Sequence, residues 1–327
     1  MTRVLWRLAL LMLCALPLGS QALAQGYPSK NVTIVVSLGA GTGMDVLVRL
    51  YADKLQAVLG KPVVVENKPG ASTMLAANAV ATSPPDGHTM VVLTSSALAI
   101  NPTLYKQINY DPNNDFIPIS LYVKSPFILV VNPKVPAKTV PELLKLAKES
   151  NPPLNYASVG AGGLQHLSME FTKNRFDLDM THVPYRATGQ QVTDIAAGHV
   201  ALGFVEAGAS IPLIKDGQLR AMAVSASTRL PLLPDVPPFS EASGAADYEA
   251  VSWHVLLVPA KTPKDIVDRL HSEMQKIMTD PDMQKKAADI GLIPITPPSV
   301  AETQAYIKSE QGKWGSLVEK LGLKGSQ

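Results

Sequence analysis

Cysteine is almost absent from this chain of 327 residues, in which Cys14 is the only one. It lies in an apolar N-terminal segment that we predict is removed, so the remaining chain has neither disulfides nor thiol chemistry. An exported protein without disulfides fits the bacterial periplasm better than a eukaryotic secretory route. The lack of cysteine therefore favours a periplasmic protein.

An excess of charge of one sign is also missing. The 29 Lys and Arg residues include Arg3 and Arg7 of the N-terminal segment, and without these two the basic residues equal the 27 acidic ones. A protein that binds nucleic acid needs a basic face to neutralise phosphates. The balanced charge argues against a nucleic-acid partner, and we predict none.

The sequence lacks the short motifs of several enzyme classes. It has no G-x-S-x-G elbow, no H-E-x-x-H zinc helix and no Gly-Lys-Ser/Thr of a phosphate-binding loop. A dinucleotide fingerprint is incomplete, because Met44 follows the glycines of residues 39–43. We therefore predict no cofactor, no metal and no catalysis. A secreted hydrolase with Ser72 or Ser95 as its nucleophile stays open as an alternative.

The first 24 residues have the pattern of a secretory signal peptide. Arg3 and Arg7 precede an apolar run over residues 8–18, and Ala22-Leu23-Ala24 fits the small-x-small cleavage rule. The apolar run is too short to span a bilayer. We expect cleavage near Ala24, release into the periplasm and no membrane insertion.

The most informative stretch begins the chain that follows. Residues 32–36 are apolar and β-branched, which predicts a buried strand, and three glycines spaced by single residues then open a helix. Thr42 and Asp45 have the spacing of a capping box at the start of that helix. Free backbone N–H groups and the helix dipole at such a start favour an anion. Asp45 is expected to cap the helix rather than contact a ligand.

Two further strands end in similar turns. Residues 62–66 lead to a Gly-rich turn with a helix after it, and residues 90–93 lead to three hydroxyl residues. In a parallel α/β sheet such strand ends meet at one edge, where ligands bind. The sequence therefore predicts an anion site at this edge, made by Ser37, Gly41, Thr42, Gly43, Ser72, Thr73, Ser95 and Ser96.

A second α/β unit follows over residues 125–248. Its strand at 154–158 enters another Gly-rich turn and helix, which would form the opposing side of a cleft through Ser158, Gly162, Gly163 and His166. An apolar strand at 251–259 returns to the first unit. We expect an α/β protein of two domains, one of residues 25–124 and 249–327 and one of residues 125–248. Each is expected to have a mostly parallel sheet flanked by helices, and two strands should cross between them.

The chain resembles the solute-binding receptors of tripartite tricarboxylate transporters, the Bug or TctC-like family. The resemblance rests on motifs spread in order along the chain: YPSK at 27–30, PVVVENKPGA at 62–71, PDGHT at 85–89, LAINP at 98–102, LNYAS at 154–158, HVPY at 182–185, LPDVP at 233–237 and PAKTP at 259–263. It implies a type II-like periplasmic binding protein. Such a receptor closes two domains over an organic carboxylate and passes it to a membrane transporter.

The first Gly-rich turn, residues 37–45, departs from the Pro-Phe-x-Pro-Gly-Gly-x-x-Asp pattern that the resemblance implies, and four later positions depart from it as well. Ser72 and Thr73 replace two glycines, Arg186 stands where Lys is common, and Glu206 stands where Asp is common. The added hydroxyls could bond a carboxylate directly, and Arg186 could pair with a second one if it faces the cleft. Glu206 could orient water, bind a ligand amine or lie in a turn.

We expect the ligand to be a di- or tricarboxylate, aliphatic or aromatic, bound by a monomer. Delivery to a membrane transporter and presentation to a sensor protein both stay open as roles. His254, like the other histidines outside the Gly-rich turns, is expected to be structural.

Overall fold

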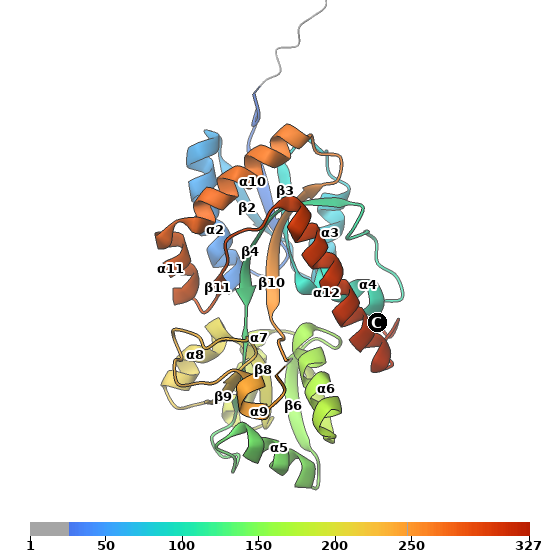
Figure 1. The fold of residues 1–327 in the computed structure, drawn as a ribbon, viewed down its shortest axis with the longest axis vertical. Helices are drawn as coiled ribbons and strands as arrows, with labels where there is room; N and C mark the ends of the chain where they lie inside the picture. The colour runs from blue at the N-terminus through green and yellow to red at the C-terminus, as the bar shows by residue number, and fades with distance from the viewer. Residues whose placement is uncertain (1–25, 247) are drawn as a thin grey trace, which may run out of the picture.

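The computed structural model describes residues 26–246 and 248–327, so the predicted signal peptide lies outside the described residues. Two α/β lobes lie one above the other along the longest axis of the molecule (Figure 1). No helix in these ranges has the length and apolar character needed to cross a membrane.

The first lobe contains a six-stranded sheet in the order β11-β4-β10-β3-β1-β2. Strand β1 pairs in parallel with β2 and β3, whereas β10 is antiparallel to β3 and β4, and β11 is antiparallel to β4. The strands are β1 (Val32–Val36), β2 (Val63–Asn67), β3 (Thr89–Thr94), β4 (Phe116–Ser125), β10 (Ser252–Pro259) and β11 (Ile293–Pro294).

Helices cover both faces of this sheet. One buried cluster joins α2, α10 and α11 to one face, and a second joins α3, η2, α4 and α12 to the other. The elements are α2 (Gly43–Leu59), η1 (Ala71–Thr73), α3 (Met74–Ala81), the π-helical η2 (Ser96–Ile100), α4 (Asn101–Leu104), α10 (Lys264–Thr279), α11 (Pro281–Asp289) and α12 (Val300–Lys320).

The second lobe contains a five-stranded sheet in the order β7-β6-β8-β5-β9. Its strands are β5 (Phe127–Val131), β6 (Leu154–Val159), β7 (Met180–Tyr185), β8 (Leu202–Glu206) and β9 (Arg220–Val224). Its helices are α5 (Val140–Glu149), α6 (Leu164–Phe176), α7 (Thr188–Ala197), α8 (Ala207–Lys215) and α9 (Phe239–Ser243).

Both sheets are mixed, whereas the sequence predicted mostly parallel sheets. Strand β5 is antiparallel to β8 and β9, as β10 is to β3 and β4. The reason is the crossing of the chain between lobes. A strand that enters a lobe from the other one runs opposite to the strands that begin inside that lobe, so each crossing inserts antiparallel neighbours. The expectation of two α/β lobes joined by two crossings is confirmed.

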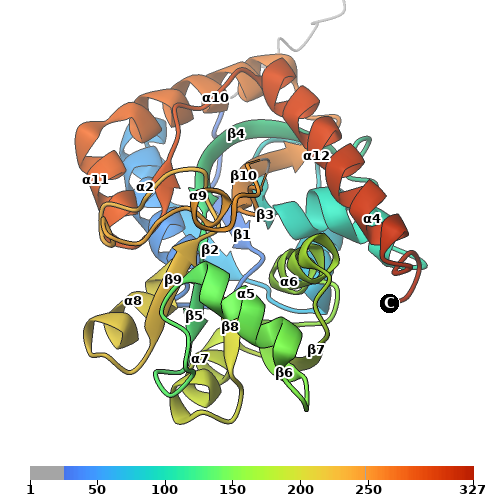
Figure 2. The ribbon, with the colours of Figure 1, turned by 60° about the horizontal axis from the view of Figure 1, so that its bottom comes forward.

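The lobes share one hydrophobic cluster. It runs from the first sheet through Leu98 and Leu104 to Leu164 and Phe204 of the second lobe. Figure 2 brings the second lobe forward and shows α6 beside the segment that contains α4. At this contact Gly162 lies so close to Leu104 that a Cβ atom on the glycine would overlap the leucine side chain.

Candidate functional site in the cleft between the lobes

A cleft of about 500 Å³ opens between the two lobes. The first lobe contributes the start of α2 and the α11–β11 turn, and the second contributes the start of α8 and Thr188 of α7. Two residues next to the crossings, Ser125 and His254, also line it. Of the residues singled out from the sequence, Gly41, Thr42, Gly43 and Glu206 lie in its wall.

The α2 start forms as the sequence indicates, with one difference. Thr42 is the N-cap, and its Oγ1 accepts a hydrogen bond of 3.4 Å from the Asp45 N–H. In a full capping box the Asp45 carboxylate would accept from the Thr42 N–H. Instead it accepts from the Gly41 N–H at 2.9 Å, where the backbone has a φ of +80° that favours glycine. The Gly41 amide is thus already satisfied by the protein.

A polar network fixes this loop. The buried Asp45 carboxylate accepts hydrogen bonds from Arg49 and from Asn67 Nδ2 at 2.9 Å, and the same Asn67 amide group donates to the Leu38 carbonyl at 3.0 Å. Burial opposes the charge of Asp45, but the bonds from Arg49, Gly41 and Asn67 outweigh it and lower the pKa of the carboxyl. Asp45 therefore positions the loop through Gly41, Arg49 and Asn67, and not through the capping box expected from the sequence.

Two amides at the α2 start are left for a ligand. Among the described residues no backbone hydrogen bond satisfies the N–H groups of Gly43 and Met44, although the next two amides are bonded to Thr42. Both residues line the cleft, and a helix N-terminus carries a partial positive charge. The sequence predicted unpaired backbone amides at the ends of three strands. In the turn after β1, the two that remain unpaired within the described residues are those of Gly43 and Met44.

The wall of the cleft that the second lobe forms contains an acidic residue, Glu206. Glu206 ends β8 and precedes α8, whose first residues Ala207 and Gly208 also line the cleft. Its carboxylate has no hydrogen-bond or ion-pair partner among residues 26–246 and 248–327, and its backbone carbonyl accepts from Ser210 Oγ. Burial raises the pKa of this carboxyl. Glu206, whose role the sequence left open, thus lies in the cleft wall.

His254, expected to be structural, lies at the cleft floor on β10. Its residue is 3% exposed, and its Nδ1 is a buried polar atom without a partner in the described part of the chain. Burial lowers the pKa of its imidazole to about 3, so the ring is neutral at physiological pH. Because the residues that follow it in β10 form a continuous apolar run, the sequence gave no sign that His254 would line a cleft.

Ser37, Ser95 and Ser96 do not line the cleft. Ser37 is buried beneath the α2 start with its Oγ toward Met44 Sδ at 3.9 Å. Ser95 is fully buried, and its Oγ donates to Ser252 Oγ at 3.3 Å, whereas Ser96 begins η2. Ser95 and Ser96 lie away from the cleft because the chain turns directly from β3 into η2, and Ser37 is covered by Met44 of α2.

Ser72 and Thr73 also lie outside the cleft wall. Ser72 Oγ accepts from the Tyr105 hydroxyl at 2.7 Å, and the Ser72 carbonyl accepts from Asn101 Nδ2 at 2.9 Å. The backbone is left-handed at three successive residues that have side chains, Ala71, Ser72 and Thr73, with φ of 45°, 48° and 73°. The glycines that the family pattern has at two of these positions would relieve this strain.

We expect Ala71→Gly to raise the free energy of unfolding by about 1 kcal/mol, because a left-handed residue with a Cβ costs about 1–2 kcal/mol and alanine has no side-chain hydrogen bond to lose. Urea unfolding followed by circular dichroism measures the change. The matched control is Ala79→Gly inside α3, which should lower the value by about 1 kcal/mol. A loss of stability in Ala71→Gly would show that the backbone there is not strained.

The residues expected on the opposing side form a separate cluster. Ser158 Oγ lies 2.7 Å from His182 Nε2, and the rings of His182 and His166 stack at 4.1 Å. His166 Nδ1 accepts from the Gly162 N–H at 2.9 Å, and Gly163 caps α6. None of these residues lines the cleft, because their turn is packed against Leu104.

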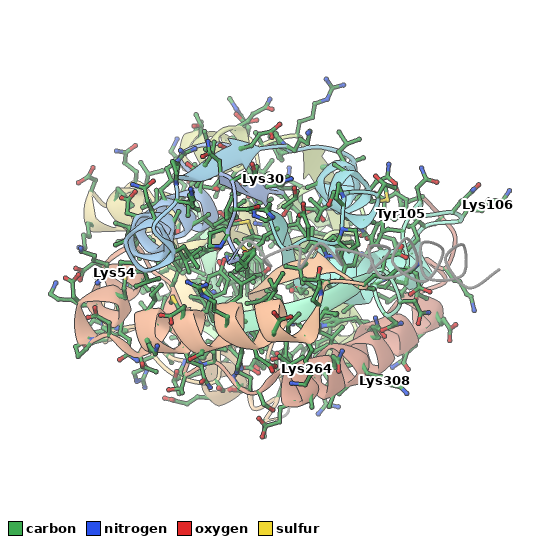
Figure 3. The ribbon with its side chains drawn as sticks, turned by 90° about the horizontal axis from the view of Figure 1, so that it is seen from above. Lys30, Lys54, Tyr105, Lys106, Lys264 and Lys308 are labelled. Atoms are coloured by element: carbon green, nitrogen blue, oxygen red, sulfur yellow. The ribbon has the colours of Figure 1, made fainter. Side chains whose placement is uncertain are left out.

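Arg186 is exposed and does not line the cleft, so the pairing with a second carboxylate is not supported by its position. The same holds for the other basic side chains that the structure describes: none of these Lys and Arg residues lines the cleft. Figure 3, seen from above, shows Lys54 and Lys106 at opposite ends of the molecule.

Comparisons with known proteins agree with this architecture. Residues 47–323 match the tripartite tricarboxylate transporter family receptor, TctC. A UPF0065 protein in the tcbD–tcbE intergenic region of Pseudomonas sp. (strain P51) is 31% identical over 302 residues, which are 92% of this chain and 89% of that protein. The structure of R. palustris Rpa4515 with adipate has a TM-score of 0.82 at 31% identity and covers 90% of this chain and 98% of that one. The structure of the periplasmic binding protein BugD has a TM-score of 0.79 at 29% identity, and the match covers 91% of this chain and 99% of that one.

Two α/β lobes with a cleft between them, matched along nearly their whole length by such proteins, define a periplasmic solute-binding protein. The chain belongs to the receptor family of the tripartite tricarboxylate transporters. The resemblance seen in the sequence motifs and the predicted fold class are both confirmed.

Proposed function

We propose that this protein captures an organic carboxylate in the cleft between its lobes, in the periplasm, and delivers it to a membrane transporter of the tripartite tricarboxylate type. The observation that carries the proposal is the pair of unsatisfied amides of Gly43 and Met44 in the cleft wall. Support also comes from the family and from the relative whose structure contains adipate.

In this mechanism the carboxylate accepts hydrogen bonds from the two amides at the α2 start. The Asp45–Arg49–Asn67 network holds the loop in place before the ligand arrives, which lowers the ordering cost of binding. The second lobe then closes over the rest of the molecule, with movement at the two crossings next to Ser125 and Ser252. The domain division at residues 124–125 and 248–249 and an N-terminal signal peptide of residues 1–24 are part of the proposal.

A thermal-shift panel of aliphatic and aromatic carboxylates tests this function. A ligand at 100 times its Kd adds about 2.7 kcal/mol to the free energy of unfolding, which raises the melting temperature by several degrees. Amines and sugars of similar size serve as controls and should give no shift. A panel without a single stabilising carboxylate would contradict the proposal.

Catalysis has little support from the site. Solute-binding relatives are not enzymes, and the serines considered as nucleophiles are bonded to Tyr105 and Ser252 rather than to a base. The Ser158–His182 contact resembles a nucleophile and its base, but Ser158 is fully buried. We therefore propose a binding protein without catalytic activity, for which an ester panel should show no turnover.

A further inference from the structure

The charges of the cleft are unevenly distributed. Within residues 26–246 and 248–327, two acids line the cleft, Glu206 and Asp289, and no Lys or Arg does. Asp289 is paired with Lys285 Nζ at 2.6 Å, and more than half of its side chain is exposed, so its charge is compensated. Glu206 alone carries an uncompensated carboxylate into the cleft, since no partner for it exists in the described part of the chain.

The free hydrogen-bond donors and the free acceptor of the cleft also lie on different lobes. Unsatisfied donors, the amides of Gly43 and Met44, lie on the first lobe. An unsatisfied acceptor, Glu206, lies on the second lobe, and the floor between them holds the partnerless Nδ1 of the buried His254. A ligand with a free carboxylate at both ends would satisfy the amides but would leave two carboxylates facing each other at Glu206, which is unfavourable in a poorly solvated site.

We infer that the ligand lies across the cleft with its carboxylate on the amides of Gly43 and Met44 and a hydrogen-bond donor at its far end against Glu206. The inference rests on the proposed function and specifies the ligand class. The donor is an ammonium, amide or hydroxyl group, or the proton of a second carboxyl group. A dicarboxylate therefore binds only together with one proton, shared between its far carboxyl group and Glu206. This requirement restricts the di- or tricarboxylate expected from the sequence.

Calorimetry with isosteric pairs of acids tests the inference. Succinate, glutarate and adipate are compared with their monoamides, in which one carboxylate is replaced by an amide of the same shape. At pH 8 the best monoamide should bind at least tenfold more tightly than the dicarboxylate of the same length. Any dicarboxylate that binds should take up one proton, seen as a heat that depends on the ionisation enthalpy of the buffer, and should weaken as the pH rises from 6 to 8.

Two variants locate the effect. Glu206→Gln can donate a hydrogen bond, so it should remove the tenfold preference or reverse it and abolish proton uptake. Asp216→Asn removes a charge from the far, exposed end of the same helix and should leave the ratio unchanged. Dicarboxylates that bind as tightly as their monoamides, without proton uptake and without response to Glu206→Gln, would overturn the inference and leave the proposed function standing. Failure of every acid of both series would count against the proposed function instead.

Discussion

We expect Gly162→Ala to lower the free energy of unfolding by about 2–4 kcal/mol. Part of the loss, about 1 kcal/mol, comes from the left-handed backbone at this position, where φ is 76°. The larger part comes from the new methyl group, which would overlap Leu104 of the other lobe. That leucine is 1% exposed within the shared hydrophobic cluster and cannot turn away without disturbing its neighbours, and overpacking of this kind costs about 1–3 kcal/mol.

The neighbouring turn supplies a matched control. Gly160 has nearly the same φ, 77°, but no atom lies within 4 Å of where its Cβ would be. Gly160→Ala should therefore lose only the backbone part, about 1 kcal/mol. Leu104→Ala should recover stability in the Gly162→Ala background, although it lowers stability by itself. Equal losses in the two glycine variants would show that the lobes do not touch at this point.

The second large effect is a loss of stability in mild acid. Burial lowers the pKa of His254 to about 3, and burial together with the nearby His166 lowers the pKa of His182 to about 4. Both rings are thus neutral in the folded protein, whereas an unfolded histidine titrates near 6.5. The two neutral rings cost no stability above pH 6.5. The free energy of unfolding falls as the pH drops from 6.5 to the folded-state pKa of each ring, about 4 for His182 and about 3 for His254.

For His254, which is almost fully buried, the loss amounts to about 1.4 kcal/mol per pH unit below 6.5, or about 2–3 kcal/mol by pH 4.5. Glu206 acts in the opposite direction, since the raised pKa of its carboxyl favours the protonated folded form as the pH falls. Asp45, whose pKa is lowered, loses its contribution only at lower pH. Between pH 6.5 and 4.5 Glu206 therefore offsets part of the loss caused by the histidines, and the contribution of His254 is obtained from the difference between the wild type and a variant without this imidazole.

Urea unfolding at pH 7.5, 6.5, 5.5 and 4.5 measures this dependence. The wild type should lose at least 2 kcal/mol across the lower part of the range. His254→Gln, which keeps a polar side chain of similar size but does not titrate, should have a flatter profile. Parallel profiles of the two proteins would show that His254 is not kept neutral by the fold.

Local sequence patterns predicted most of the secondary structure. The β-branched run and the glycine-rich turn place β1 and α2 within a residue or two, and Thr42 caps α2 as expected. The segment from Ser96 to Leu104 was not predicted as helical, because Pro102 and the polar residues after it favour a loop. Local propensity carried no information about the antiparallel neighbours of β5 and β10, which depend on how the chain crosses between the lobes.

The candidate site could be predicted only in part. The α2 start and Glu206 follow from strand ends that open helices, a signal contained in a few consecutive residues. Ser95 and Ser158 also stand at strand ends, yet their hydroxyl groups form hydrogen bonds inside the protein, with Ser252 and His182. His254 has no such signal, because its place in the cleft depends on the relative position of the two lobes. Tertiary packing decides which hydroxyl group at a strand end remains free to bind a ligand, and the spacing of residues in the sequence does not show it.

The position of the bound carboxylate tests the central claim most directly. A crystal structure of the protein with the acid that gives the largest thermal shift should place two carboxylate oxygens about 2.7–3.1 Å from the backbone nitrogens of Gly43 and Met44. A carboxylate held outside the cleft, or bound within it by other groups while these two amides remain without a partner, would contradict the account.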